Sequence, residues 1–202
     1  MIKIIKEHSF FDDFLSDKNI IIDLGACRGE FSSEFMKHYP THKCILVEAN
    51  PTNFRYLPND DKIIKYMNLI STKNDEEITF YEDPKSPYNG SKMFNYFNGI
   101  EHKIKTITLD KIISENNIDY IDLLKIDIEG SEYELLENLS MSTLEKVKQI
   151  TIEFHDFIDP SLKNRTEIIV KKIEDFGFKS ISKPIKYMYD SNHYDVLFYK
   201  KN

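Results

Sequence analysis

The chain has 202 residues, 34 of them acidic and 27 basic, so its formal net charge is −7. This length predicts a single domain over residues 1–202, and the 41% hydrophobic fraction excludes a disordered or fibrous protein. The acidic balance argues against nucleic acid as a partner, no apolar run approaches the ~20 residues of a membrane span, and two cysteines without a signal-peptide core favour a cytoplasmic protein.

Short β-branched runs alternate with amphipathic stretches, which is typical of an α/β domain. Residues 1–18 are expected to form a helical lead-in. Strands are predicted at residues 19–23, 43–48 and 62–67, with a helix at 30–39 and a short helix that begins at Pro51. The first strand is a continuous apolar run, of the kind that is buried on both faces of a parallel sheet.

Residues 72–108 are predicted to form an inserted hairpin and loop after the third strand. Residues 78–82 and 103–108 alternate like half-exposed strands, and the loop between them is rich in Pro, Gly, Asn and aromatic residues. A loop this long inside a compact domain is usually functional. Aromatic faces and amides suit a sugar, so the predicted substrate residues are Tyr88, Ser91, Phe94 and Tyr96. A surface flap packed by its own aromatic residues would show the same pattern.

Regular elements return in the second half of the chain. Helices are predicted at residues 109–116, 131–139 and 162–176, and strands at 121–127, 147–154, 179–183 and 194–199. This order predicts a doubly wound, mostly parallel sheet whose last strand is antiparallel. In such sheets ligands bind outside the carboxyl ends of the strands, so the residues there are the candidate functional ones.

The loop after the first strand reads Asp23-Leu24-Gly25-Ala26-Cys27-Arg28-Gly29. Its two glycines permit close backbone approach and a tight turn into the following helix. Counted from Gly25, a cysteine and a glutamate occupy the second and third glycine positions of G-x-G-x-x-G, which argues against a nicotinamide enzyme. Glu48 ends the second strand, where a carboxylate can accept both ribose hydroxyls of an adenosine cofactor.

This loop resembles the first motif of the class I S-adenosylmethionine-dependent methyltransferases. Residues 121–132 (IDLLKIDIEGSE), together with Thr108-Leu109-Asp110, resemble the hallmark of the FkbM-type methyltransferases, and residues 47–51 (VEANP) are similar to that family's second-strand pattern. The resemblance spans about residues 20–156. The chain departs from the family at Cys27, where Asn is usual, which removes a polar side chain but permits the same backbone turn.

The resemblance implies a Rossmann-like, seven-stranded sheet and S-adenosylmethionine as the cofactor. The cofactor-binding residues that it implies are Asp23, Gly25, Ala26 and Gly29 around the methionine part, Glu48 and Ala49 at the ribose, Asn68 near the adenine, and Asp127. It also favours a sugar or glycoconjugate acceptor, and a place within a larger glycan-synthesis protein or pathway.

Methyl transfer to an alcohol requires a positioned nucleophile and a base for its proton. Four residues at the ends of the fourth and fifth strands are the candidate catalytic residues: Asp127, His155, Glu129 and Lys125. The alternatives are structural. Acids are favoured at a helix N-terminus, the lysine can pair with an acid, and the histidine can bond to loop backbone.

A divalent ion is a further prediction for this edge of the sheet. Asp127 with Glu153, His155 or Asp156 could hold an ion that lowers the pKa of a bound hydroxyl. The function predicted from the sequence is thus O-methylation of a sugar hydroxyl. Three alternatives stay open: a non-sugar small molecule or natural product as the acceptor, a non-catalytic binding module, and, disfavoured by the acidic charge, an RNA ribose methyltransferase.

Overall fold

The computed structural model describes residues 1–17, 20–86, 90–91, 99–156, 159–185 and 193–201. Its central sheet consists of β3 (Ile20–Leu24), β4 (Lys43–Val47), β5 (Ile63–Tyr66), β10 (Leu123–Ile126), β11 (Gln149–Glu153), β12 (Lys179–Ile185) and β13 (His193–Tyr199). The strand order is β12-β13-β11-β10-β3-β4-β5. β13 runs antiparallel to both of its neighbours, whereas the pairs among β11, β10, β3, β4 and β5 are parallel. The predicted doubly wound, seven-stranded sheet is therefore confirmed.

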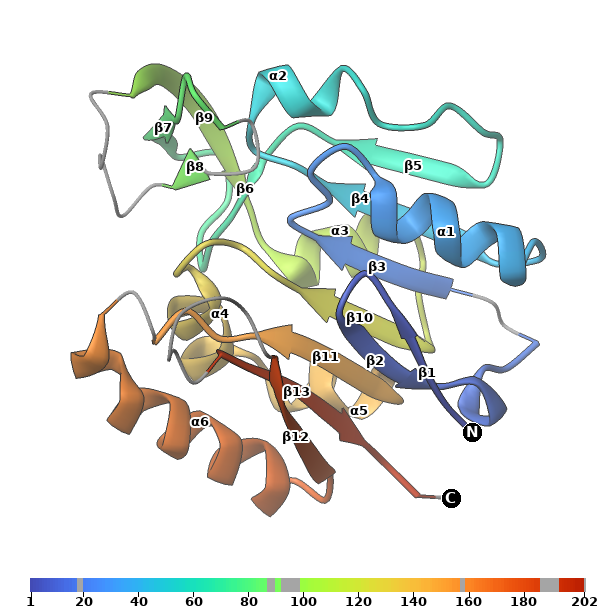
Figure 1. The fold of residues 1–202 in the computed structure, drawn as a ribbon. Helices are drawn as coiled ribbons and strands as arrows, with labels where there is room; N and C mark the ends of the chain where they lie inside the picture. Colours follow the sequence, from blue (N-terminus) through green and yellow to red (C-terminus); the bar gives the residue numbers. More distant parts are fainter. Residues whose placement is uncertain (18–19, 87–89, 92–98, 157–158, 186–192, 202) are drawn as a thin grey trace.

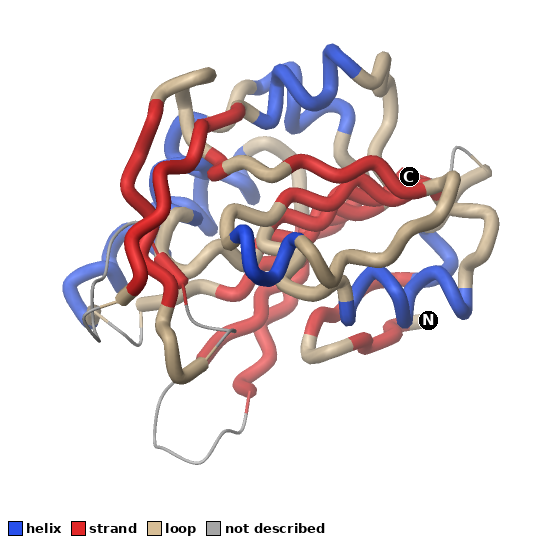
Figure 2. The backbone as a smooth tube through the Cα atoms, turned by 90° about the horizontal axis from the view of Figure 1, so that it is seen from above, coloured by secondary structure: helices blue, strands red, loops and turns tan. Residues whose placement is uncertain are grey.

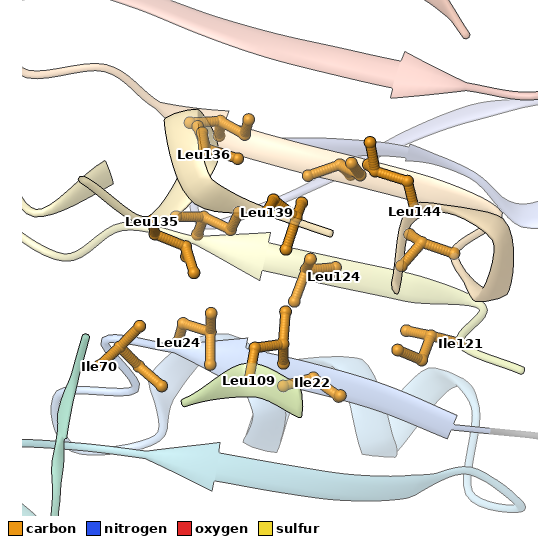
Figure 3. Packing of buried hydrophobic residues seen from close by; sticks show 14 of the residues in the cluster. Ile22, Leu24, Ile70, Leu109, Ile121, Leu124, Leu135, Leu136, Leu139 and Leu144 are labelled. Carbon is orange, nitrogen blue, oxygen red and sulfur yellow. The ribbon is translucent and has the colours of Figure 1, made fainter. Parts of the chain in front are cut away.

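Helices cover both faces of this sheet (Figure 1; Figure 2). They are α1 (Glu30–His38), α2 (Pro51–Phe54), α3 (Leu109–Glu115), α4 (Glu132–Asn138), α5 (Met141–Lys146) and α6 (Lys163–Asp175). The larger apolar core includes Leu24, Leu124 and Leu136, and Figure 3 shows part of it between the strands and the helices. Helix α5 was not predicted from the sequence. Among the described residues, none of the helices has the length and hydropathy needed to cross a bilayer.

The expected helical lead-in at residues 1–18 is wrong. Strands β1 (Ile2–Ile5) and β2 (His8–Phe11) form an antiparallel hairpin, and a 3-10 turn, η1 (Asp12–Phe14), follows. The two residues between the strands, Lys6 and Glu7, both have positive φ, at 46° and 75°. Two successive positive φ values are the signature of the tight turns that join adjacent antiparallel strands. The alternation of apolar and charged residues in this segment is therefore compatible with a β-hairpin as well as with a helix.

This N-terminal hairpin lies against the sheet, where β2 contacts β11 and β13. The Phe11 amide donates to Gln149 Oε1 at 2.7 Å, and Gln149 Nε2 donates back to the Phe11 carbonyl at 3.1 Å. Phe10 is fully buried and its ring lies 5.4 Å from that of Phe35 on α1. The hairpin thus covers a sheet face beside α1, and His8 at the start of β2 points toward the carboxyl ends of the strands.

The insertion forms a second, smaller sheet in the order β6-β9-β7-β8. Its strands are β6 (Leu69–Ile70), β7 (Glu77–Glu82), β8 (Gly90–Ser91) and β9 (Ile100–Ile107). In Figure 1 these strands lie beyond the end to which the arrowheads of the parallel strands point. Glu82 Oε2 accepts from the Thr52 hydroxyl at 3.1 Å and lies 2.7 Å from His102 Nε2. The structure thus confirms the predicted hairpin, and the Thr52 contact ties it to helix α2.

Only part of the predicted substrate loop is described. Ser91 lies in β8, where its backbone pairs with Tyr81. Tyr88, Phe94 and Tyr96 lie outside the described residues. Binding of an acceptor by this loop therefore stays a prediction.

Candidate active site

The loop after β3 brings two distant segments of backbone into contact. Gly25 has a φ of 78°, and a Cβ at this position would lie 1.7 Å from the carbonyl oxygen of Asp127. Because any side chain would force the two segments apart, the glycine permits this approach. Gly29 has a φ of 79°, and its Cβ would lie 2.5 Å from Pro58 Cδ. Cys27 also has a positive φ, 49°, so the turn forms although Asn is absent.

Glu48 follows β4 and is buried beside this loop. Its Oε2 accepts from the Cys27 amide at 2.7 Å and its Oε1 from the Asn50 amide at 2.6 Å. Burial raises the pKa of Glu48 to about 7, against the opposing effect of the two amides. Asn50 is 1% exposed, and its Nδ2 has no hydrogen-bond partner among the residues described. A buried donor of this kind beside a carboxylate fits a polar ligand such as a ribose.

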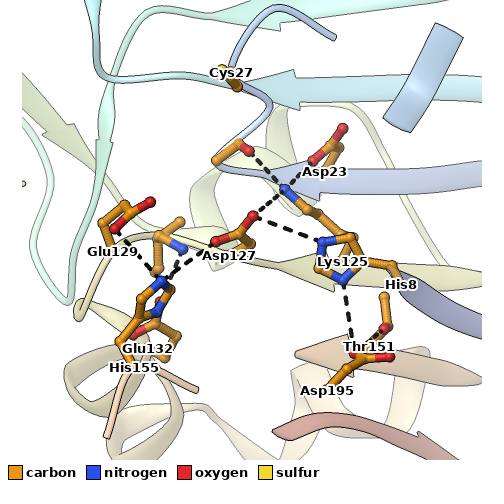
Figure 4. A network of polar contacts seen from close by, with 12 residues as sticks. His8, Asp23, Cys27, Lys125, Asp127, Glu129, Glu132, Thr151, His155 and Asp195 are labelled. Carbon is orange, nitrogen blue, oxygen red and sulfur yellow. Dashed lines mark hydrogen bonds and ion pairs between the residues drawn. The ribbon is translucent and has the colours of Figure 1, made fainter. Parts of the chain in front are cut away.

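Lys125 lies at the centre of a charged network between β3 and β10 (Figure 4). Its Nζ donates to the Gly25 carbonyl at 2.7 Å and lies 3.1 Å from Asp23 Oδ1 and 3.4 Å from Asp127 Oδ2. Although burial opposes the charge, the two carboxylates raise the pKa of Lys125 above its usual value. Lys125 therefore holds its proton and fixes the loop, which supports the pairing interpretation. The Ser32 hydroxyl completes the network by donating to Asp23 Oδ2 at 2.6 Å.

Asp127 lies between two histidines at the end of β10. Its Oδ1 is 3.8 Å from His155 Nε2, and its Oδ2 is 3.7 Å from His8 Nε2. Burial works against ionisation, but Lys125 and the histidines lower the pKa of Asp127 far below its usual range. The pKa of His8 is raised to about 9, because the Asp127 and Asp195 carboxylates outweigh its burial. His8 was not among the predicted site residues, since no motif surrounds it.

His155 is held by a carboxylate that the sequence analysis also missed. Its Nδ1 lies 2.8 Å from Glu132 Oε1, which accepts from the Ile128 amide at 2.9 Å as well. Its Nε2 lies 3.5 Å from Glu129 Oε2. Burial disfavours the imidazolium, but three carboxylates raise the pKa of His155 well above 6.5. Glu132 is the first residue of α4, where the helix dipole favours an acid, and its Oε1 also accepts from the Gly130 amide of the preceding turn at 3.3 Å.

Glu129 is carried by a turn that bends sharply out of β10. Its φ is 52°, and that of Gly130 is 92°. Burial raises the pKa of Glu129 to about 8, and although His155 opposes this shift, Asp127 and Glu132 add to it. Its side chain keeps 34% of its surface exposed, compared with 4% for His155 and 5% for Lys125. Of the four predicted catalytic residues, Glu129 thus combines access with a pKa near neutrality.

The structure changes the set of predicted metal ligands. Asp156 belongs to neither of the two groups of possible ligands found among the described residues, and its Oδ2 accepts from the Thr166 hydroxyl at 3.1 Å. Glu153 and Asp127 lie instead with His8, and Asp127 also lies with Glu129 and His155; in each trio, ligand atoms lie within 4.8 Å of one another. Carboxylate and imidazole groups can hold divalent ions. A metal ion at Asp127 stays a prediction.

The other predicted cofactor residues lie around the same edge of the sheet. Ala26 is buried, and its amide donates to the Val47 carbonyl at 3.0 Å. Ala49 packs against the small apolar cluster below the insertion. Asn68 Nδ2 donates to the Lys105 carbonyl of β9 at 3.0 Å. Adenine binding by Asn68 is not tested by this contact and stays a prediction.

Comparisons with known proteins agree with this geometry. Residues 23–180 match the family model described as "Methyltransferase FkbM domain". Hexuronic acid methyltransferase AglP of Haloferax volcanii is 28% identical over 135 residues, which cover 59% of this chain and 54% of that protein. AMB antimetabolite synthetase AmbE of Pseudomonas aeruginosa is 35% identical over 78 residues, which cover 39% of this chain and 4% of that protein. The match thus spans about half of one curated relative and a small part of the other.

Solved structures share the fold at low sequence identity. The Methanococcus jannaschii fibrillarin pre-rRNA processing protein has a TM-score of 0.56 at 14% identity, with 99% of this chain and 70% of that chain covered. A chain of a fibrillarin/Nop5p complex has a TM-score of 0.53 at 15% identity, with 93% of this chain and 75% of that chain covered. Because the family model covers most of the sequence, the chain belongs to the FkbM methyltransferases and uses S-adenosylmethionine as its cofactor.

Proposed function

We propose that the protein is an O-methyltransferase that methylates a hydroxyl of a sugar in a glycan or glycoconjugate. The observation that carries this proposal is the Glu129 carboxylate, which lies beside Asp127 at the carboxyl end of β10 and has a pKa of about 8. A base tuned near the operating pH suits removal of a hydroxyl proton. The similarity to a protein named as a hexuronic acid methyltransferase supports a sugar acceptor.

When bound, S-adenosylmethionine supplies an electrophilic methyl group. In our proposal Glu48 holds the ribose, and Glu129 accepts the proton of the acceptor hydroxyl on its carboxylate. Asp127 stays ionised because Lys125 lies beside it. His155 stays protonated and steadies Glu129 from 3.5 Å.

The protonation states of the neighbouring groups support this assignment of the base. Lys125 and His155 hold their protons at neutral pH, since the pKa of each is raised by carboxylates. Asp127 is a poor proton acceptor, because its pKa lies far below its usual range. Our proposal therefore gives Lys125, Asp127 and His155 positioning and electrostatic roles, and leaves the proton to Glu129.

The proposed function is tested by two measurements in sequence. Calorimetry with S-adenosylmethionine should give a heat of binding. Incubation with the cofactor and a panel of glycosides, hexuronic acid glycosides among them, should give a product that is heavier by one CH₂ and a stoichiometric amount of S-adenosylhomocysteine. No binding would contradict the cofactor site. Binding without any glycoside product would favour a natural-product acceptor, the second candidate, which the similarity to AmbE supports.

Replacing Glu48 by glutamine should weaken cofactor binding by about 10-fold or more, the effect expected when a charge-assisted hydrogen bond is lost. Both oxygens of Glu48 accept from backbone amides. The NH₂ group of a glutamine would therefore place a hydrogen-bond donor opposite one of these backbone N–H donors. Calorimetry measures the change in affinity. Glu77→Gln, at an exposed position on β7, is the control. Equal affinity for both variants would remove Glu48 from the cofactor site.

In contrast to the metal ion predicted from the sequence, the charges around Asp127 lead us to expect that chelation leaves turnover unchanged. Asp127, which both candidate metal trios share, already lies beside the Lys125 cation and the two histidines. Turnover after dialysis against EDTA is compared with turnover after addition of Mg²⁺ or Mn²⁺. Activity that is lost on chelation and restored by either ion would make one trio a metal site, with Glu129 or Glu153 as a ligand rather than a base.

A further inference from the structure

Two buried residues that are far apart in the sequence, His8 and Asp195, lie beside each other, and His8 also lies beside Asp127. His8 starts β2 in the N-terminal hairpin, and Asp195 lies on β13 near the C-terminus. Both lie outside residues 23–180, the region that matches the family model. The family match therefore assigns no role to either residue.

The contacts form a chain from Asp195 through His8 to the Asp127 carboxylate (Figure 4). His8 Nε2 lies 3.7 Å from Asp127 Oδ2, and His8 Nδ1 lies 3.8 Å from Asp195 Oδ1. Asp195 is 1% exposed, and it accepts from the Thr151 hydroxyl at 3.0 Å and from the Ser9 amide at 3.2 Å. Asp195 is thus fixed by two donors before it meets His8.

The position of His8 is fixed by packing on several sides. Its side chain is 5% exposed, and its ring lies edge-on against Phe31 of α1, 5.6 Å away at 88°. The far end of β2 is held by the reciprocal hydrogen bonds between Phe11 and Gln149. Because β2 is anchored at both ends, the position of the His8 ring relative to the sheet is fixed. The hairpin thus acts as a rigid support for His8.

Both carboxylate oxygens of Asp127 consequently lie beside basic side chains. Oδ2 faces Lys125 and His8, whereas Oδ1 faces His155. Without His8, Oδ2 would keep Lys125 on one side but lose its partner on the other, so the carboxylate could rotate about its χ2 angle and Oδ1 would leave its place beside His155 Nε2. Glu129 Oε2 lies 3.5 Å from the same nitrogen, so the electrostatic surroundings of Glu129 would change in turn.

We propose that His8, held by Asp195, is a positioning residue for methyl transfer that fixes the orientation of the Asp127 carboxylate. The expected effect on the rate of methyl transfer rests on the proposed function, whereas the expected effect on the orientation of Asp127 does not. A misplacement of about 1 Å near the reacting atoms can cost on the order of 10²-fold in rate. The N-terminal hairpin is on this proposal part of the active site.

The kinetic test compares His8→Gln and Asp195→Asn with a matched control in the full-length protein. The control is His42→Gln, because His42 is also 5% exposed and lies 3.6 Å from a buried aspartate, Asp122. We expect His8→Gln to lower kcat by about 10–100-fold with cofactor affinity within about twofold of wild type. Asp195→Asn should lower kcat less, and the double variant should be no slower than His8→Gln because the two residues act as a unit.

The geometric test is independent of any acceptor. Crystal structures of wild type, His8→Gln and His42→Gln with S-adenosylhomocysteine should show Asp127 turned or disordered only in the His8 variant. An unchanged Asp127 orientation in His8→Gln would overturn the proposal, as would additive kinetic effects of the two substitutions. If His8→Gln does not fold, the same comparison is made with His8→Asn and with Asp195→Asn alone. Absence of turnover by the wild type would contradict the proposed function. The orientation of Asp127 in the crystal structures would then decide whether His8 positions this carboxylate.

Discussion

Substitution of Glu129 by glutamine should lower kcat by roughly 10²–10⁴-fold, the contribution expected of a positioned general base. The amide keeps the shape of the side chain but cannot take a proton. Because Glu129 must be ionised to act and its pKa is about 8, kcat/KM of the wild type should rise with pH through that value. Steady-state kinetics between pH 6 and 10 on the acceptor found by mass spectrometry measures both effects.

The control for this substitution is Glu137→Gln on α4, whose carboxylate pairs with Arg165 on the surface. It should leave kcat unchanged. Cofactor affinity should be equal in both variants, because Glu129 is proposed to act on the acceptor. A kcat for Glu129→Gln within a few-fold of wild type, or a pH profile that is unaltered, would remove Glu129 as the base and return His155 and Asp127 to consideration.

Replacement of Lys125 by methionine should destabilise the protein by about 3–5 kcal/mol, the cost of removing one partner from a buried ion pair. Asp23 is fully buried, and its Oδ1 faces Lys125 Nζ at 3.1 Å, so the variant leaves an uncompensated charge in the core. The Gly25 carbonyl would also lose its 2.7 Å donor. Urea unfolding followed by circular dichroism gives the free energy of unfolding.

The pH dependence of that loss tests its electrostatic origin. The pKa of Asp127 is lowered by Lys125 in the folded protein, so this interaction stabilises the fold above the unfolded pKa of about 4 and is lost as pH falls through the folded pKa. The difference between wild type and Lys125→Met should therefore be largest near pH 7 and shrink below pH 4. Lys171→Met, on an exposed i,i+4 pair of α6, should show neither effect. A deficit that is independent of pH would instead indicate lost packing.

Local patterns in the sequence predicted most of the sheet. The strands β3 and β10 are apolar apart from Asp23 and Lys125 because both faces of each strand are buried, and this composition can be read from the sequence alone. The glycines of the first loop and the acid after β4 are equally local, since a tight turn and a strand end need no distant residue to be recognised. Helix α5 was missed because its six residues are too few for a clear period.

The N-terminal segment shows where such patterns fail. Residues 2–11 contain apolar residues broken by charge, which suits a short amphipathic helix as well as a hairpin. The choice between them depended on the surface that the segment covers: Gln149 on β11 presents an amide to the backbone of Phe11, a contact that an extended strand can make. That surface is assembled from strands more than a hundred residues away, so no local propensity could reveal it.

The sequence by itself thus determined the fold class, the family and the strand ends where charged groups gather, because these follow from short-range periodicity and from motifs written in consecutive residues. Only the tertiary structure decided which of those groups meet. It added His8, Glu132 and Asp195 to the site and turned Asp156 toward Thr166. Ionisation was decided there as well, because the pKa of a buried group depends on the burial and neighbouring charges that folding creates.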